Sequence, residues 1–321
     1  MSASQCIVTG AAGFIASHLC ERLVAEGFSV MGIDNFHPFY SRAQKDFNLR
    51  TLQDQAAFTF VEGTICDRPF LERLFSRDQI IFHLAAQANV RHSLNPVAFD
   101  EYHQINVEGT LNILQAAQQA NVERLIFVSS SSVYGHHTTI PTDELSPAFP
   151  QSPYGVTKLA GEHYTRMFSE LFDLPVVTLR PFSISGARQR PDMGIAIFAK
   201  AIQNGDPINV FGDGNQQRDF THVDDLVDAI LLAVEKESAL GEDFNIGGGN
   251  LESVNGLIKL LEDETGRDSQ LSYGSPVKGE TDITHANIQK AKKELGFAPT
   301  RSLRKAVRDY LDWLEAFHQS R

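Results

Sequence analysis

Cysteine and long apolar segments are both scarce in this chain. Its three cysteines, Cys6, Cys20 and Cys66, are too few and too scattered to suggest a disulfide framework or a zinc site, so we expect free thiols and no metal. No apolar run approaches the roughly 20 residues that span a membrane. Residues 1–5 show no secretory pattern. These absences argue against a membrane partner and predict a cytoplasmic location.

Basic residues are also in short supply. Lysine and arginine together number 28 against 40 aspartates and glutamates, which gives a formal net charge of −12. A protein that binds nucleic acid needs a basic face, so this balance argues against a nucleic-acid partner. The same field would repel a phosphorylated small molecule. Helix N-termini and individual arginines in loops must then supply any attraction for phosphate.

What the chain does contain is a regular alternation of strand and helix signals. Apolar segments typical of buried strands recur at 5–9, 28–33, 58–61, 79–83, 124–129 and 175–179, and helical periodicity occupies 13–26, 97–120 and 154–172. Such alternation indicates a parallel sheet covered by helices on both faces. We therefore predict an α/β fold, a Rossmann-like doubly wound parallel sheet with a smaller mixed α/β lobe for substrate.

The second lobe is expected because the alternation stops after Arg180-Pro181. Loops rich in glycine and proline follow, and further helices are predicted at 253–265, 286–295 and 303–317. Helix 223–235 and strand 242–246 are expected to return to the first sheet. We therefore predict one domain from residues 1–181 plus about 216–247, and a second lobe from residues 182–215 plus 248–321.

A glycine loop joins the first predicted strand to the first predicted helix. Gly10 and Gly13, followed by Ala16, allow the backbone to approach a pyrophosphate whose charge sits at the helix N-terminus. Asp34 ends the second strand about twenty residues on, where its carboxylate can accept from ribose hydroxyls and would repel a 2′-phosphate. A plain turn is the alternative for the loop alone. Taken with Asp34, the loop predicts an NAD-binding domain in residues 1–181.

Two further features remain open on sequence alone. His83-Leu84-Ala85-Ala86-Gln87 ends the fourth predicted strand with small residues, which suits either a cofactor lying across the sheet edge or a well-packed strand end. Asn106 lies inside a helical pattern. A solvated side chain is the simpler interpretation, because a buried asparagine would need hydrogen-bond partners.

The pair Tyr154 and Lys158 carries the strongest chemical signal. Four residues apart on a predicted helix, they share one face. A phenol has a pKa near 10 in water, and an ammonium group beside it favours the phenolate. A serine of the run Ser129 to Ser132 could share the proton. With a nicotinamide ring nearby, this set predicts removal of a proton from an alcohol while hydride leaves the same carbon. Without the other motifs the spacing alone would be a chance pattern.

These features occur together in the extended short-chain dehydrogenases/reductases, the NAD-dependent nucleotide-sugar epimerases and dehydratases. The chain resembles this family over nearly its whole length. The resemblance lies in the glycine loop, His83 to Ala86, Asn106 to Thr110, Ser130 to Gly135, Tyr154 with Lys158, Arg218 to Thr221, and Asn245 to Gly247. It implies that Tyr154 is the base, that Lys158 holds the nicotinamide ribose and lowers the tyrosine pKa, and that Ser130 is the hydroxyl partner.

The resemblance also implies two sets of binding residues. For NAD the set is Gly10, Gly13, Phe14, Ile15, Asp34, Asn35, Phe36, Thr64, Ile65, Leu84, Ala85, Ala86, Gln87, Asn106, Ser129, Tyr154, Lys158 and Pro181. For a UDP-sugar it is Arg91, Ser130, Ser131, Ser132, Tyr154, Ser183, Arg190, Val210, Arg218, Lys278 and Glu280. Some of these depart from the family pattern. Thr64 stands where an aspartate usually contacts adenine, and Lys278 and Glu280 replace an arginine and an aspartate. Asn89 replaces a usual glycine.

Within the family the chain looks most like the UDP-glucuronate 4-epimerases. Similar dehydratases carry an Asp-Glu pair at Ser131 and Ser132, because elimination of water needs a further acid and base, and related decarboxylases carry a glutamate at Ser132. Hydroxyls can hold a sugar carboxylate without repelling it. Ser131, Ser132, Ser183 and Arg190 are therefore the candidates for that grip, unless the serines merely form a tight turn.

The expected reaction is 4-epimerisation of UDP-glucuronate or UDP-galacturonate through a 4-keto intermediate. The alternatives are epimerisation of neutral or N-acetylated UDP-hexoses, a dehydratase, decarboxylase or reductase of the same family, and an idle NAD-binding interaction protein. The intact Tyr154, Lys158 and Ser130 argue against the last. By resemblance a homodimer is also expected, paired through helices 97–120 and 154–172.

Overall fold

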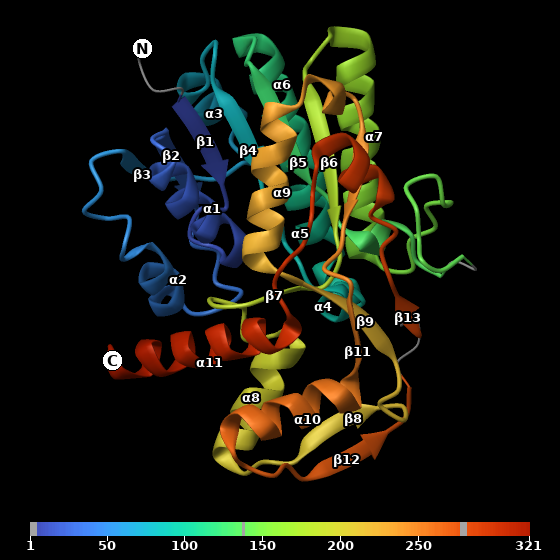
Figure 1. The fold of residues 1–321 in the computed structure, drawn as a ribbon. Helices are drawn as coiled ribbons and strands as arrows, with labels where there is room; N and C mark the ends of the chain where they lie inside the picture. The colour runs from blue at the N-terminus through green and yellow to red at the C-terminus, as the bar shows by residue number, and fades with distance from the viewer. Residues whose placement is uncertain (1–4, 137–138, 277–280) are drawn as a thin grey trace.

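The computed structural model describes residues 5–136, 139–276 and 281–321. At its centre is a seven-stranded sheet with the order β10-β6-β5-β4-β1-β2-β3, in which every neighbouring pair is parallel (Figure 1). The strands are β1 (Gln5–Thr9), β2 (Ser29–Asp34), β3 (Phe58–Glu62), β4 (Ile80–His83), β5 (Arg124–Val128), β6 (Val176–Pro181) and β10 (Asp243–Ile246). The order reverses between β1 and β4, where ligands bind in open sheets of this kind.

Helices cover both faces of this sheet. On one face lie α1 (Phe14–Ala25) and α9 (Val223–Glu235), and on the other α3 (Arg68–Leu74), α6 (Gly109–Ala120) and α7 (Pro153–Phe172) (Figure 1). Alternate strand residues enter opposite cores: Ile126 packs toward α9, while Leu125 and Phe127 pack toward α6 and α7. The strands are therefore largely apolar, as a sheet buried on both faces requires. The predicted doubly wound α/β fold is confirmed.

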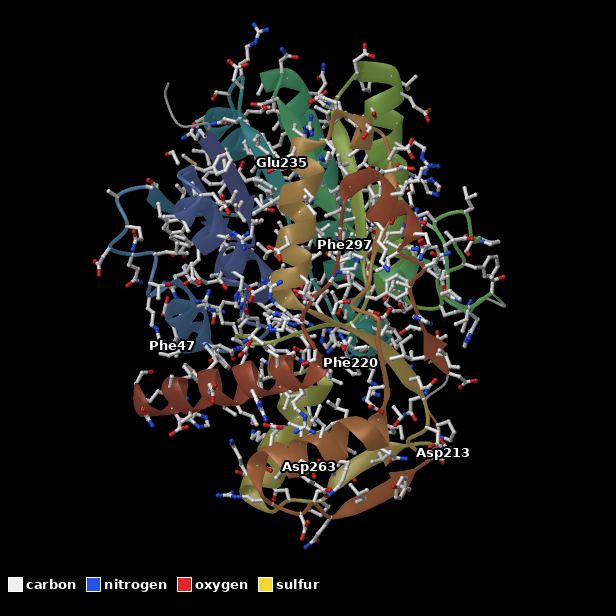
Figure 2. All side chains as sticks on the ribbon, in the orientation of Figure 1. Phe47, Asp213, Phe220, Glu235, Asp263 and Phe297 are labelled. Carbon is white, nitrogen blue, oxygen red and sulfur yellow. The ribbon has the colours of Figure 1, made fainter. Side chains whose placement is uncertain are left out.

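A smaller lobe lies at the carboxyl ends of the strands. Its own core joins α8 (Gly194–Asn204), α10 (Val254–Thr265), α11 (Leu303–Gln319) and the parallel pair β8 (Ile208–Phe211) and β12 (Leu271–Gly274). The strands β7 (Ile184–Ser185), β9 (Gln217–His222), β11 (Asn250–Ser253) and β13 (Ile283–Thr284) connect it to the large sheet. In Figure 2, Phe220 of β9 lies where the two parts meet, and Phe297 lies beside α9.

The remaining short elements lie in the connections. They are α2 (Arg42–Leu49), α4 (Val90–Ser93), η1 (Pro96–Ala98), α5 (Phe99–His103), η2 (Gln104–Glu108), η3 (Ser131–Val133), η4 (Glu237–Ala239) and η5 (Ala291–Leu295). Among the described residues, no helix is both long and apolar enough to cross a membrane.

Two predicted helices differ from the structure. The segment 97–120 is divided into η1, α5, the π-helix η2 and α6, and η2 turns Asn106 inward. The segment 286–295 is helical only near its end: Ala286 pairs with Thr142, and the π-helix η5 covers Ala291–Leu295. Residues of 286–297 pack into the core beneath α9. The proposed division of the chain into two domains stays a prediction.

Candidate active site

A deep cavity of about 870 Å³ lies between the carboxyl ends of the strands and the smaller lobe. It brings together most of the residues that the sequence singled out. Its walls include Gly10, Gly13, Phe14, Ile15, Asp34, Asn35, Thr64, Ile65, Leu84, Ala85, Ala86, Gln87, Arg91, Ser129, Ser130, Ser131, Ser132, Tyr154, Lys158, Pro181, Ser183, Arg190, Val210 and Arg218. Phe36 and Asn106 do not line it. Lys278 and Glu280 lie outside the described residues.

The glycine loop forms one end of the cavity. Gly10 has φ 76°, and a Cβ there would lie 3.0 Å from Ala85 Cα. Only glycine lets the loop pass this close to the end of β4. Gly13 is the N-cap of α1 and offers no side-chain cap, so the first amides of the helix are left for a ligand. This is the environment that a pyrophosphate requires.

Asp34 fastens the loop to the end of β2. Its carboxylate accepts hydrogen bonds from the backbone amides of Ala12 at 3.1 Å and Phe36 at 2.7 Å. Burial raises the pKa of Asp34, and the nearby Lys45 ammonium and these two amides partly offset the rise. Lys45 is itself buried, lines the cavity and donates to His37 O at 2.7 Å. No sequence signal pointed to Lys45, because it lies in a polar segment with no recognisable pattern.

Phe36 and Asn106 stand behind the cavity wall. The Phe36 ring packs against Phe60, with the Arg42 guanidinium above it. Phe36 therefore contributes to the site only through its backbone amide, which donates to Asp34. Asn106 is buried, which corrects the expectation of a solvated side chain. Its Oδ1 accepts from Gln87 N at 2.8 Å, and its Nδ2 donates to Gln87 O and Thr157 Oγ1. Its amide is thus occupied in holding the end of β4 against α7.

Four buried polar atoms of the cavity-lining residues form no hydrogen bond with the described residues. They are Gln87 Nε2, Ser129 Oγ, His37 Nδ1 and Thr284 Oγ1. A buried polar group without a partner is costly, so these atoms fit a ligand that carries polar groups. Together with the open helix N-terminus at Gly13 and the carboxylate of Asp34, they form a surface whose polar groups can bind a dinucleotide. The residues present therefore fit NAD.

Tyr154 and Lys158 lie in the first turns of α7. Ser152 caps this helix by accepting from Gly155 N at 3.1 Å, and Pro153 occupies its first position. Tyr154 therefore sits at the positive end of the helix dipole, which favours a phenolate. Lys158 is buried one turn on, with Nζ 4.4 Å from the centroid of the Phe127 ring. No described residue accepts a hydrogen bond from this ammonium group.

The electrostatics of the pair differ from the expectation. Burial raises the pKa of Tyr154, while the neighbouring Ser130 hydroxyl and the charge of Arg190 lower it. Burial lowers the pKa of Lys158 to about 7, against the opposing effect of Glu162. In this structure, Ser130 and Arg190 rather than Lys158 assist ionisation of the tyrosine. A low-dielectric site favours the neutral form of both groups until a charged ligand enters.

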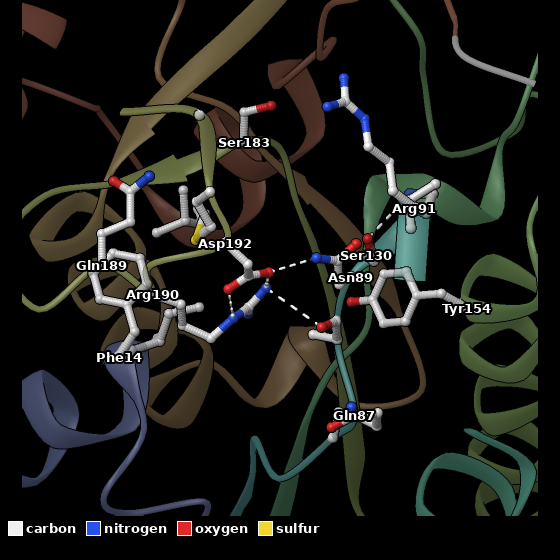
Figure 3. Close-up of a pocket in the computed structure, with 18 of the residues that line it drawn as sticks. Phe14, Gln87, Asn89, Arg91, Ser130, Tyr154, Ser183, Gln189, Arg190 and Asp192 are labelled. Atoms are coloured by element: carbon white, nitrogen blue, oxygen red, sulfur yellow. Dashed lines mark hydrogen bonds and ion pairs between the residues drawn. The ribbon is translucent and has the colours of Figure 1, made fainter. Parts of the chain in front are cut away.

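Several serine residues line the cavity. After β5 the chain forms the 3₁₀ turn η3, in which Ser130 Oγ accepts from Ser132 N at 3.1 Å. Ser130, Ser131 and Ser132 line the cavity, and Ser183 lines it from a backbone with φ 25°. The serine run therefore forms a tight turn that also faces the cavity, and its hold on a carboxylate stays a prediction. Figure 3 shows Ser130 beside the hydroxyl of Tyr154.

Arg190 does not stand alone in the cavity. Its Nε and Nη2 bind the two carboxylate oxygens of Asp192, each at 2.9 Å (Figure 3). Asn89 Nδ2 donates to Asp192 Oδ2 at 2.7 Å. No sequence pattern marked Asp192 or Asn89 as a site residue, although Asp192 stands two residues from Arg190. Pairing with a carboxylate leaves Arg190 a weaker anion ligand than a free guanidinium.

The other arginines lie toward the smaller lobe. The Arg91 guanidinium carbon is 4.7 Å from the centroid of the Phe211 ring on β8, so the two parts of the protein meet across the cavity. Arg218 lines the cavity from β9 and donates to Gln217 O at 2.8 Å. Arg188 turns away and pairs with Glu21 at 2.6 Å. Arg91, Arg190 and Arg218 are thus the described arginines that line the cavity.

Comparisons with known proteins agree with this geometry. A model of the NAD-dependent epimerase/dehydratase family matches residues 6–247. The chain is 37% identical over 314 residues to an uncharacterised UDP-glucose epimerase of Bacillus subtilis, covering 98% of each chain. It is 35% identical to a UDP-glucuronate 4-epimerase of Thermodesulfobacterium geofontis, covering 96% of this chain and 95% of that one.

A solved structure is equally similar. The UDP-glucuronic acid 4-epimerase of Bacillus cereus, in complex with UDP-glucuronic acid and NAD, superposes with a TM-score of 0.91. It shares 35% sequence identity, and the match covers 97% of this chain and 99% of that one. Fold and sequence agree over nearly the whole length.

Proposed function

The chain belongs to the NAD-dependent epimerase/dehydratase family, and from this premise we propose that it inverts C4 of a UDP-sugar, with UDP-glucuronate or UDP-galacturonate as substrate. The observation that carries the proposal is the joint placement of Tyr154 and Ser130 on a cavity whose sugar end carries serines at 131 and 132. A dehydration would need a further acid and base at those positions, and hydroxyls do not supply them.

Tyr154 is the group that exchanges a proton with the C4 hydroxyl. As a phenolate it accepts this proton at Oη, and Ser130 and the α7 N-terminus stabilise the charge. NAD, when bound, supplies a reversible acceptor for the hydride of C4. The free donors of Lys158 suit the hydroxyls of a ribose. A bound anionic ligand would favour the ammonium form of Lys158.

Gln87 and Ser129 complete the binding of the cofactor. Their unpartnered Nε2 and Oγ atoms would hold polar groups of the nicotinamide half, and Leu84, Ala85 and Ala86 leave room beside them. At the other end, the open amides of the first turn of α1 would hold the pyrophosphate, and Asp34 the adenine ribose. Asn106 acts behind this wall by fixing Gln87.

A uronate needs a firm hold on its carboxylate. Oxidation at C4 makes it a β-keto acid, which loses carbon dioxide readily if the carboxylate can rotate freely. Ser131, Ser132 and Ser183 line the cavity and can donate hydrogen bonds to it, and Arg190, although paired with Asp192, keeps its Nη1 group as a further donor. Inversion also requires the 4-keto sugar to turn over before Tyr154 returns the proton. The diphosphate, held between Arg91 and Arg218, would serve as the pivot.

One observation favours a second candidate, the 4-epimerisation of neutral UDP-hexoses. The charge of Arg190 is balanced by Asp192, so this wall of the cavity carries no net charge. A neutral sugar would meet no unpaired ion there. The serine hydroxyls could then bind its C6 hydroxyl instead of a carboxylate.

Product analysis decides between these candidates. We would incubate the purified protein with NAD and, separately, UDP-glucuronate, UDP-glucose and UDP-N-acetylglucosamine, and resolve the products by NMR. A 4-inverted uronate supports the proposal. If only the neutral sugars are converted, a UDP-uronate is not the substrate. Tyr154→Phe should keep NAD binding and lose turnover. Net formation of NADH would instead point to a dehydrogenase or reductase.

We also propose that the protein forms a homodimer through α5, α6 and α7. Val97 of the adjoining η1 is 89% exposed, Val156 of α7 is 53% exposed, and Phe99 of α5 is exposed too. Apolar side chains gathered in this way favour a partner surface. A cytoplasmic location stays a prediction.

A further inference from the structure

Asn89, at the rim of the cavity, has a backbone conformation that side chains rarely adopt. Its φ and ψ are 148° and 112°. This region suits glycine, and another residue held there is strained. Strain at a binding site persists only when the surrounding contacts hold the residue in place. The contacts of Asn89 should therefore account for it.

The Asn89 side chain forms two hydrogen bonds whose directions are unambiguous. Its Nδ2 donates to Asp192 Oδ2 at 2.7 Å, and its Oδ1 accepts from His92 N at 2.9 Å. A carboxylate can only accept and a backbone amide can only donate, so the amide has a single orientation. The carbonyl oxygen of Asn89 accepts from Tyr102 Oη at 2.9 Å. Both ends of the residue are thus fixed.

Through Asp192, Asn89 reaches Arg190. Asp192 holds the Nε and Nη2 edge of the guanidinium, and Ala88 O accepts from Nη2 at 3.4 Å (Figure 3). Among the described residues none accepts from Arg190 Nη1. One edge of the guanidinium is therefore locked, and the Nη1 group is left for a ligand.

We propose that Asn89 is a positioning residue that sets the preference of the site for an anionic over a neutral sugar. Its N–H occupies Asp192 Oδ2 and offsets part of the negative charge that an incoming carboxylate would meet. It also fixes Asp192, and hence Arg190, in the geometry that leaves Nη1 free. A fixed guanidinium loses less conformational freedom when it binds a carboxylate. This inference rests on the proposed function.

The test compares the affinities for two sugars in matched variants. Calorimetry on the NAD-loaded protein would measure the Kd of UDP-glucuronate and of UDP-glucose. Asn89→Gly suits the observed backbone, so it should fold and melt close to wild type. We expect about tenfold weaker binding of UDP-glucuronate, the effect of one hydrogen bond to a charged group. Binding of UDP-glucose should change by less than about twofold, within the context dependence of single contacts.

Two controls isolate the cause. Asn121 is also an asparagine with positive φ, 54°, but it ends α6 and does not line the cavity. Asn121→Gly should therefore leave both affinities unchanged. In an Arg190→Ala background, Asn89→Gly should have no further effect on the ratio of the two Kd values, because its target is gone.

The outcomes separate this inference from the proposed function. If wild type binds UDP-glucuronate and Asn89→Gly keeps the same ratio, Asn89 has no positioning role. An equal loss for both sugars, or an undiminished effect in the Arg190→Ala background, contradicts it too. If wild type binds neither sugar, the proposed function is wrong, and this inference, which depends on it, is wrong too.

Discussion

Replacement of Ser130 tests the electrostatic account of the tyrosine most directly. The Ser130 hydroxyl lies beside that of Tyr154 and lowers its pKa against the upward effect of burial. Ser130→Ala removes this hydroxyl and raises the tyrosine pKa further. A hydrogen bond to a charged group is worth about 1.5–3 kcal/mol. The phenolate should therefore be about 10- to 100-fold scarcer at neutral pH, and kcat/KM should fall by the same factor.

The pH profile separates this effect from a structural one. The active form is deprotonated, so activity rises with pH toward the tyrosine pKa, and loss of Ser130 should move this limb to higher pH. Activity at a pH above the raised pKa should largely return. Ser130→Thr, which keeps a hydroxyl, should behave like wild type. Since Ser130 Oγ also accepts from Ser132 N, a loss that is equal at every pH would show that Ser130 shapes the turn only, and would refute the reasoning.

Three further predictions concern other parts of the molecule. Gly10→Ala places a Cβ 3.0 Å from the end of β4 and should weaken NAD binding at least about tenfold by calorimetry, whereas Gly27→Ala, with φ 90° but open space, should not. Arg180→Met leaves the buried Glu162 without its bidentate partner and should cost about 3–5 kcal/mol in urea unfolding, and a hydrophobic replacement of both residues should recover most of it. Val156→Glu should convert the proposed dimer to a monomer in light scattering, and an unchanged mass would place the interface elsewhere.

The family and the fold could be predicted because they rest on local signals. Alternating strand and helix patterns predicted every strand of the large sheet to within a few residues, and the family resemblance is confirmed by the comparisons. The motifs around Gly10 and Ser130 directly follow strands β1 and β5, and Tyr154 lies at the start of helix α7. The carboxyl ends of parallel strands meet at one edge, so these motifs had to converge on one cavity.

The finer predictions failed where burial decides the outcome. A sequence shows that Lys158 follows Tyr154 by one turn, but not that both lie in a region where burial favours the neutral forms. It shows Asn106 in a helical pattern, but not the π-helix that turns it inward. Lys45 and Asp192 were missed because their partners are distant in sequence or belong to an unpredicted loop conformation.

The order of residues by itself determined the alternation of elements, the glycine loop and the chemistry that Tyr154 and Ser130 can perform. Only the tertiary structure decided which charges are neutralised, as Arg190 is by Asp192, and which polar atoms are left open, as Gln87 Nε2 and Ser129 Oγ are. The physical reason is that hydrogen bonds and periodic packing act between near neighbours, whereas the cost of a charge depends on all the atoms that displace water around it.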